Sequence, residues 1–180
     1  MLKSSLHPNT NAMLQAWQRM TSSPGDIDGG PSAHEYPGLL GKLFVIESMR
    51  KGFAPFRIAG SELSDILGRD LIGTDFLDLW QDTDRLFSEA LITSVTNEDR
   101  PGILRGIGET SQGRRLEIEI AVAPLAEEAT GRRRLLCLYQ TLGGEAMLQH
   151  RSIWTHRIRS IHPPEPLARK ANLRLVASRD

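Results

Sequence analysis

The chain has 180 residues, of which 39% are hydrophobic and 24% are charged, and its 22 basic and 22 acidic side chains give no formal net charge. This length and composition are typical of one soluble globular domain with terminal extensions. No apolar run approaches the roughly 20 residues that span a bilayer, and residues 1–14 lack the uninterrupted apolar stretch of a secretory signal, so we expect a cytoplasmic protein without a transmembrane segment.

The charges are unevenly distributed along the chain. From Gly143 onward, seven Lys/Arg stand against three Asp/Glu, so the rest of the chain carries the matching acidic excess. A basic tail of this kind can contact nucleic acid or an anionic membrane, or it can lie on its own acidic domain. Composition alone leaves these alternatives open.

The N-terminal segment predicts one helix followed by a linker. Residues 10–22 carry three large apolar side chains at the spacing of one helical face, namely Met13, Trp17 and Met20. The following stretch is rich in Ser, Pro, Gly and Asp and shows no apolar periodicity. We therefore assign residues 1–35 to an N-terminal helix and linker, and residues 36–143 to a folded domain.

The folded domain shows strand and helix patterns in an order typical of an antiparallel sheet. Aromatic and β-branched runs predict a hairpin at 42–49 and 55–60, followed by short glycine-bounded helices and a longer amphipathic helix from residue 82. Three more strands are expected at 102–110, 114–125 and 132–143. The order predicts an α+β fold with a five-stranded antiparallel sheet, helices on one face, and the first strand beside the last.

Charged residues near the end of this domain have a structural explanation in the same scheme. The three arginines at 132–134 are expected to approach Glu117 and Glu119 across the last hairpin. Exposed cross-strand pairs of this kind contribute under ~1 kcal/mol each.

The signature FRIAG-x-x-L-x-x-x-x-GRDLIG at residues 56–73 resembles a bacterial family of PAS domains that was long catalogued as a domain of unknown function. The resemblance covers residues 10–143 and includes Trp17, the pair Tyr36-Pro37 and the pair Pro124-Leu125. It implies the PAS fold and a sensory or regulatory role without catalysis. It supplies no known cofactor and no catalytic residue.

PAS domains enclose a cavity on the helical side of the sheet, so the resemblance implies a place for a ligand of unknown identity. The apolar residues expected to line that cavity are Phe56, Ile58, Leu71, Phe76, Leu91, Ile103 and Leu116. A filled core is the alternative, because cavities cost stability. Arg105 and Tyr139 are the polar candidates for holding a small anionic molecule, whereas Arg57 alternates with apolar neighbours and is expected to point outward.

The sequence disfavours the common PAS cofactors and a metal site. A flavin photoreceptor needs a reactive cysteine in the helical segment, but the single Cys137 lies in the last strand, where a buried structural thiol is expected. Residues 36–143 contain no histidine for haem. His150, His156 and His162 are six residues apart, which sends them to different faces of a helix. No nucleophile elbow, Walker loop or HExxH motif is present, so no enzyme is predicted.

The C-terminal segment, residues 144–180, predicts a basic helix and tail. Met147, Trp154 and Ile158 form an apolar stripe at helical spacing, arginines surround it, and Pro163 ends it. The candidate interface residues are therefore Met13, Trp17, Met20, Met147, Trp154 and Ile158. Packing on the chain's own sheet, a homodimer and the docking of a signalling protein are all compatible with this pattern.

Two functions remain open from the sequence. The first is a sensory or regulatory module that binds a small ligand or docks a signalling protein, and relays its state through helix packing or dimerisation. The second is a scaffold whose basic C-terminal helix binds nucleic acid or an anionic membrane. Because Trp154 is the only aromatic residue after Gly143, a base-stacking platform is lacking, and a protein partner ranks above nucleic acid.

Overall fold

The computed structural model of the protein describes residues 5–22, 38–48, 52–126, 132–148 and 150–164. Helices and strands follow one another in the order α1 (Pro8–Ser22), α2 (Leu39–Lys42), β1 (Leu43–Ser48), β2 (Phe56–Ala59), α3 (Ser61–Leu67), η2 (Phe76–Leu79), α4 (Asp82–Glu98), β3 (Gly102–Thr110), β4 (Arg115–Pro124), β5 (Arg133–Thr141), η3 (Glu145–Leu148) and β6 (Ile153–His162). The predicted N-terminal helix and the strand and helix pattern of the central domain are confirmed. None of the helices in these ranges has the length and apolar character needed to cross a membrane.

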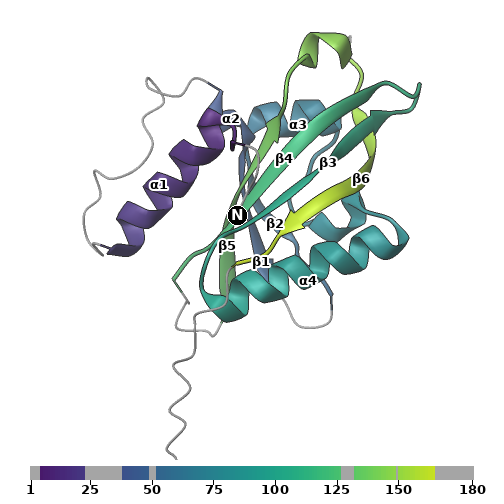
Figure 1. Cartoon of the computed structure of the whole chain (residues 1–180). Helices are drawn as coiled ribbons and strands as arrows, with labels where there is room; N and C mark the ends of the chain where they lie inside the picture. The colour runs from purple at the N-terminus through teal and green to yellow at the C-terminus, as the bar shows by residue number, and fades with distance from the viewer. Residues whose placement is uncertain (1–4, 23–37, 49–51, 127–131, 149, 165–180) are drawn as a thin grey trace, which may run out of the picture.

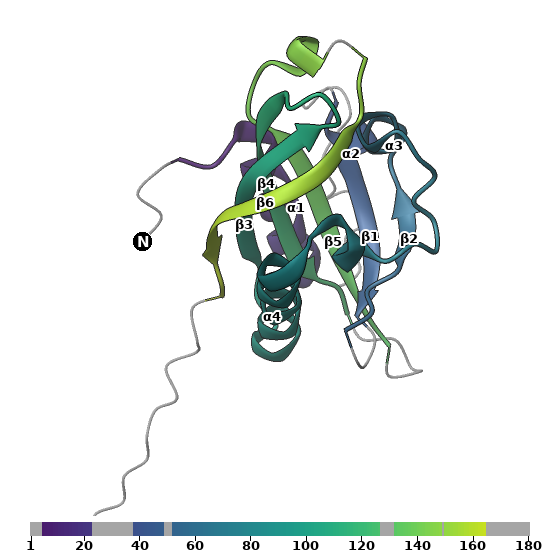
Figure 2. The same ribbon diagram turned by 90° about the vertical axis from the view of Figure 1, so that its right-hand side faces the viewer.

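Within the described residues the strands form one antiparallel sheet of six strands in the order β2-β1-β5-β4-β3-β6 (Figure 1). The first strand, β1, lies between β2 and β5, as the interruption by helices predicts. The predicted α+β architecture is therefore confirmed, with one strand more than the five expected. The additional strand is β6, which pairs with β3 at the edge of the sheet (Figure 2).

The prediction of a C-terminal helix is wrong for residues 153–162, which form β6. Two bulges interrupt the pairing of β6 with β3, and they leave Trp154 and Arg159 without a partner of their own on β3. A bulge inserts one residue and breaks the alternation of period two that identifies a strand. The apolar residues of β6 therefore fall at a spacing that imitates a helix.

Glycines on β3 allow β6 to pack closely against it. A Cβ atom on Gly106 would lie 2.4 Å from the carbonyl oxygen of Arg157, and one on Gly108 would lie 2.7 Å from Cδ1 of Ile153. Both distances are shorter than real Cβ contacts, so a larger residue would push the two strands apart. The close packing of β6 on β3 therefore explains why glycine recurs in the GILRGIGET segment.

Each face of the sheet carries its own apolar cluster. The main core lies beneath α3, η2 and α4 and contains the mutually packed rings of Phe44, Phe56 and Phe76, whose centroids are 5.3 to 5.9 Å apart. A second cluster lies beneath α1, which sits on the opposite side of the sheet from α4 (Figure 1). Helices of the central domain therefore cover one face, as predicted, and the N-terminal helix covers the other.

The arginines at the start of β5 do not meet the glutamates of β4. In an antiparallel hairpin the adjoining ends pair, so Leu135 faces Pro124, whereas Glu119 faces Gln140 at the far end. Arg134 instead lies opposite Glu47 of β1. The prediction that residues 132–134 approach Glu117 and Glu119 is wrong for this reason.

Candidate functional site

Six of the nine side chains predicted to line a pocket meet in the main core. They are at most 6% exposed, and they are Phe56, Leu71, Phe76, Leu91, Leu116 and Tyr139. They come from strands on one face of the sheet and from the helical segment above it, as the resemblance implies. Their aromatic rings pack against one another, so this region is occupied by side chains.

The remaining three residues do not join that group, so the prediction of one shared pocket is wrong for them. A bulge in the pairing of β1 with β2 places Phe56 opposite Ile46 and Ile58 opposite Val45, so Ile58 turns to the other face, where it is 58% exposed. Ile103 packs in the second cluster beneath α1, and Arg105 shares its face of β3. Sequence alternation identified Arg105 and Ile103 as neighbours but not the face on which they lie.

A buried polar group lies at the edge of the main core, and the sequence did not predict it. The hydroxyl of Tyr139 is 2.9 Å from Nε2 of His156, and the imidazole lies with its centroid 5.2 Å from that of the Trp80 ring. Nε1 of Trp80 and Nδ1 of His156 are buried and form no hydrogen bond of standard geometry within the described residues. His156 reaches the core because β6 is a strand whose alternate residues face inward.

Burial determines the protonation states of His156 and Tyr139. Desolvation lowers the pKa of His156 to about 4, with Arg69 adding to the effect and the Leu79 backbone carbonyl opposing it. Burial, and then the charge of Glu145, raises the pKa of the Tyr139 hydroxyl well above its ordinary value. At neutral pH both side chains are therefore uncharged and can donate or accept single hydrogen bonds.

A second polar group holds the N-terminal segment on the opposite face of the sheet. Glu119 is fully buried; its carboxylate accepts hydrogen bonds from the backbone N–H of His7 at 3.0 Å and from Nε of Arg105 at 2.8 Å. Nη2 of Arg105 also donates to the carbonyl oxygen of Ser5 at 2.9 Å. We call this group the latch, and it comprises Ser5, His7, Asn9, Arg105, Glu119 and Gln140.

Helix α1 itself is held by the latch contact of Asn9 and by a further contact of Trp17. Nδ2 of Asn9 donates to Oε1 of Gln140 at 3.0 Å, and Nε1 of Trp17 donates to the carbonyl oxygen of Pro124 at 2.6 Å. Desolvation lowers the pKa of His7, although the charge of Glu119 opposes this. Thus Arg105, predicted to bind an anion, is already engaged by a carboxylate of its own chain.

The predicted interface residues have different environments. Met13 is 1% exposed, and it packs with the half-buried Trp17 against the chain's own sheet, whereas Met20 at the end of α1 is 36% exposed. On β6, Trp154 is 73% exposed, while Ile158 packs against the main core. The side chain of Met147 lies outside the described residues.

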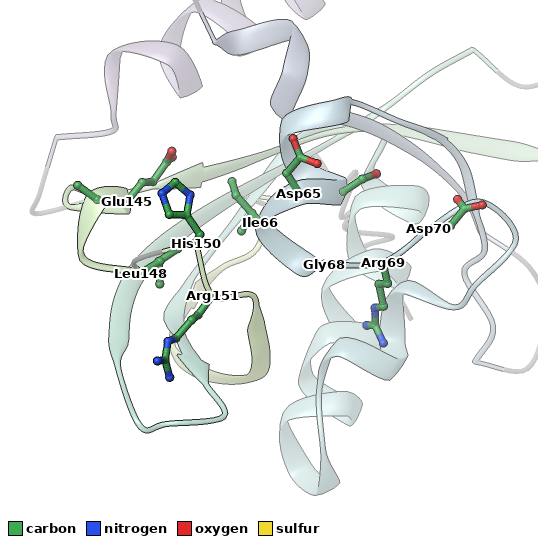
Figure 3. Close-up of a pocket in the computed structure, with 11 residues that line it drawn as sticks. Asp65, Ile66, Gly68, Arg69, Asp70, Glu145, Leu148, His150 and Arg151 are labelled. Carbon is green, nitrogen blue, oxygen red and sulfur yellow. The ribbon is translucent and has the colours of Figure 1, made fainter.

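An open groove of about 960 Å³ lies between α3 and the connection from β5 to β6 (Figure 3). One wall comes from residues 64–66 and 68–70, and the other from 145–146, 148 and 150–151. Ile66 and Leu148, which also belong to the main core, contribute apolar surface. Charged side chains, among them Arg69 and Arg151, stand around it (Figure 3).

The residues present do not fit cysteine-based flavin chemistry or a clustered metal site. Cys137 is fully buried on β5, where desolvation raises its thiol pKa well above the ordinary value, and the helical segment from 61 to 98 contains no cysteine. No group of three or more His, Cys, Asp or Glu side chains that could hold a metal occurs in the part of the chain that the structure describes. The absence of a cofactor stays a prediction.

Solved PAS and LOV structures are among those similar to the chain. The chain is similar to a LOV protein of Rhodobacter sphaeroides (13% identity, TM-score 0.47, 62% of this chain and 63% of that chain covered). It is also similar to the PAS domain of Bordetella pertussis BvgS (13% identity, TM-score 0.43, 59% of this chain and 80% of that chain covered). A fungal LOV domain photoreceptor is similar as well (15% identity, TM-score 0.45, 69% of this chain and 88% of that chain covered). The chain spans less than two thirds of the Rhodobacter protein.

No curated protein is significantly similar to the chain. A family model described as a PAS domain matches residues 6–140, which is most of the chain and includes most of the latch, most of the main core, the strands β1 to β4 and all but the last residue of β5. PAS domains are in general sensory and regulatory modules, and they commonly mediate contacts between proteins. The chain belongs to the PAS domain family.

Proposed function

We propose that this PAS domain is a non-catalytic regulatory module that relays its state through the docking and release of α1. The observation that carries the proposal is the latch, a small set of polar contacts that fixes α1 on the outer face of the sheet. In the docked state α1 covers the sheet. In the released state the same helix presents its apolar face to a signalling protein or to a second copy of the chain.

The contact area of α1 supports a reversible docking. Only Ala12, Met13 and Ala16 are both apolar and buried on the helix, and the buried hydroxyl of Thr10 lacks a hydrogen bond within the described residues. An isolated helix of this length is marginally stable in water, so the state of α1 depends on its contacts with the sheet. Few contacts on a short helix give a docking free energy that a partner can outweigh.

The latch is centred on a buried ion pair of the sheet, between Glu119 of β4 and Arg105 of β3, and both partners also contact the N-terminal segment. Breaking a buried ion pair by removing one partner typically costs about 3 to 5 kcal/mol, because the other charge stays buried. Glu119 is 0% exposed; it accepts the backbone N–H of His7 directly, and its ion-pair partner Arg105 donates to the carbonyl oxygen of Ser5. A change at this site therefore acts directly on the helix.

The docking of α1 accounts for the covering of two of the three predicted interface residues on this helix. Met13 and Trp17 pack on the domain's own sheet in the docked state, whereas Met20 is 36% exposed. Release of the helix would expose all three together. This single rearrangement supplies both the relay and the docking surface of the proposed function.

Substitution of the latch carboxylate tests the proposal. In the Glu119→Gln variant, amide hydrogen exchange in α1 should accelerate by at least about tenfold, which corresponds to ~1.4 kcal/mol, while exchange in β4 and β5 stays slow. The matched control is Glu117→Gln on the same strand, because Glu117 is exposed. This control should leave exchange in α1 unchanged.

A second variant tests the helix from its other end. Trp17→Phe keeps a smaller aromatic ring but removes the donor to the Pro124 carbonyl, so it should also accelerate exchange in α1 without unfolding the sheet. If α1 and the sheet lose protection together in both variants, α1 is an integral part of the fold and the relay proposal fails.

A small ligand in the main core is a second candidate function, and one observation favours it. Nε1 of Trp80 is buried without a hydrogen-bond partner in the part of the chain that the structure describes, and such an atom typically costs about 1 to 3 kcal/mol. A small molecule that offers an acceptor there would satisfy it. Native mass spectrometry of freshly purified protein should then show a retained molecule that the Trp80→Phe variant loses, and an empty wild-type protein contradicts it.

The scaffold function built on a basic C-terminal helix is not proposed. Residues 153–162, which were expected to form that helix, form β6 and belong to the sheet. Two of its arginines, Arg157 and Arg159, remain exposed on the strand. Without the helix, the argument for a separate basic docking element no longer holds.

A further inference from the structure

We propose that the groove between α3 and the β5–β6 connection binds a small organic anion. The acidic head group would contact Arg69 and Arg151, and the apolar body would lie on Ile66 and Leu148 (Figure 3). The proposal does not depend on the release of α1, which lies on the opposite face of the sheet.

The groove is built by two parts of the chain with different relationships to the PAS family. The wall formed by α3 and the turn after it lies inside the matched residues 6–140, whereas the wall at 145–151 lies beyond them. The groove is thus a feature that the C-terminal extension of this chain adds to the domain. Its ligand cannot be inferred from the family and must be argued from the side chains.

The charges around the groove favour an anion. Of the three carboxylates, Glu145 is paired with Nζ of Lys42 at 2.5 Å and also bonded to the Thr141 hydroxyl, and Asp70 accepts the backbone N–H of Ile72 at 3.1 Å. The third, Asp65, points away from the end of the groove at which the two arginine side chains lie (Figure 3). Neither Arg69 nor Arg151 has an ion pair with a described residue. The guanidinium groups are therefore the available charges.

Two guanidinium groups suit a carboxylate or a phosphate. Arginine presents a planar set of donors that matches the oxygens of either group, and such charge-assisted hydrogen bonds are stronger than neutral ones. Arg69 follows the C-terminal turn of α3, and Arg151 lies just before β6, so their side chains extend from opposite walls and would turn toward a shared anion on binding (Figure 3).

The groove adds a small apolar area to its charged groups. Ile66 is 8% exposed and Leu148 is 6% exposed, so each presents a small part of its side chain to the groove while the rest continues into the main core. Ligand pockets of roughly 300 to 1,000 Å³ with an apolar lining and few polar groups are typical of small-molecule sites. A volume of about 960 Å³ lies at the upper end of that range.

The walls are held in place without a ligand. Lys42 fixes Glu145, and the backbone N–H of Arg151 donates to the Leu148 carbonyl at 2.9 Å. Gly68 has a φ of +63°, and a Cβ atom there would lie 1.9 Å from Oγ of Ser152. The two walls therefore meet at a glycine, which both adopts the left-handed conformation and admits the close approach.

Binding of simple probes to the full chain tests the proposal. Hexanoate and hexyl phosphate carry the two anionic head groups on the same apolar body, hexylammonium reverses the charge, and acetate lacks the apolar body. We expect saturable shifts of the Arg69 and Arg151 Nε–H signals in NMR titrations with hexanoate or hexyl phosphate. The better of the two probes identifies a carboxylate or a phosphate as the preferred head group.

Variants separate this site from general attraction of anions. The Arg69→Gln/Arg151→Gln double variant should lose at least tenfold in affinity for the better probe, whereas Arg159→Gln, an exposed arginine on β6 outside the groove, should keep it. Both substitutions are at the surface, and circular dichroism verifies their fold. The proposal is overturned if neither anionic probe binds saturably, if hexylammonium binds equally well, or if both variants lose affinity alike.

Discussion

The imidazole of His156 lies in the main core between the Tyr139 hydroxyl and the Trp80 ring, and it stays neutral there. Because burial lowers its pKa from 6.5 to about 4, the unfolded chain binds a proton in that interval and the folded chain does not. The free energy of unfolding should therefore fall as the pH decreases from 6.5 toward 4, by roughly 3 kcal/mol in total. Urea unfolding at a series of pH values measures this slope.

The His156→Gln variant should flatten the slope between pH 6.5 and about 4.5. His7 titrates in the same direction, since its pKa is also lowered, so His7→Gln serves as the comparison and should remove a smaller part. Glu47 and Glu145, whose pKa values are lowered, would add their own loss below about pH 4.5. A His156→Gln slope equal to that of the wild type would mean that His156 is not buried in the neutral form.

Single residues were predictable from the sequence where alternation was regular. Phe56, Leu116 and Tyr139 lie in the core as expected, because each occupies an inward position of its strand. Ile58 was misplaced because the bulge next to it reverses the faces of β2. Alternation placed Arg105 with Ile103 but did not show that a helix from outside the central domain would cover that face.

The ion pair between Arg105 and Glu119 could not be predicted from the spacing of residues in the sequence. These residues face each other across β3 and β4 in the observed register, and a register requires knowledge of the turn between the strands. His156 was missed for a related reason, since its inward direction follows from a strand that the sequence pattern did not reveal. Both cases show that the polar sites depend on pairing rather than on local composition.

Strand β6 has one buried and one exposed residue side by side at its start. Ile153 is 3% exposed and packs over Gly108, whereas the neighbouring Trp154 is 73% exposed. Ile153→Ala should therefore destabilise the protein by about 2 to 5 kcal/mol, and Trp154→Ala by less than about 0.5 kcal/mol. Denaturation in urea with each variant provides the measurement.

A helix at this position would give the opposite ranking, because Trp154 and Ile158 would then form the buried stripe. A larger loss of stability in Trp154→Ala than in Ile153→Ala would therefore contradict the strand. Each variant serves as the control for the other, because the two residues are adjacent and neither is charged.

Elements with caps and strong periodicity were predicted well. Helix α3 ends at Gly68 in the left-handed conformation, as a glycine after an apolar helical segment indicates. Helix α4 and strands β3 to β5 follow the ranges expected from their patterns within a few residues. β6 escaped prediction because two bulges in ten residues remove the regular alternation.

The arrangement of the whole molecule separates α1 from the main core. If α1 docks reversibly, it should be released at a lower urea concentration than that which unfolds the sheet. In a Trp80→Phe/Trp154→Phe variant, Trp17 is the only tryptophan and its fluorescence reports on α1. Its midpoint should lie below the midpoint of the far-UV circular dichroism recorded on the same sample.

The complementary variant, Trp17→Phe/Trp154→Phe, keeps Trp80 as the only tryptophan and reports on the main core. Its fluorescence and circular dichroism should give the same midpoint. Coincident transitions in both variants would show one cooperative unit and would argue against a separately released α1.

Topology could be predicted for most of the molecule because the order of elements and the resemblance both pointed to the same antiparallel sheet. The position of α1 could not, although β4 contained a signal for it. Ile120 and Val122 face the main core, whereas Ala121 and Ala123 between them face the other way, and small residues leave room for a helix. An alanine face on a central strand thus identifies where an additional helix packs.

The sixth strand has a practical consequence for anyone who isolates this domain by its homology limits. A chain cut at residue 140 would keep every residue matched to the family yet lack Ile153, His156 and Ile158, which complete the core from outside the match. The hydrogen-bonding groups of β3 would then be bare along an edge lined with glycine, and such an edge readily pairs with other chains. Expression limits for this protein are better set by the sheet, through residue 164, than by the family.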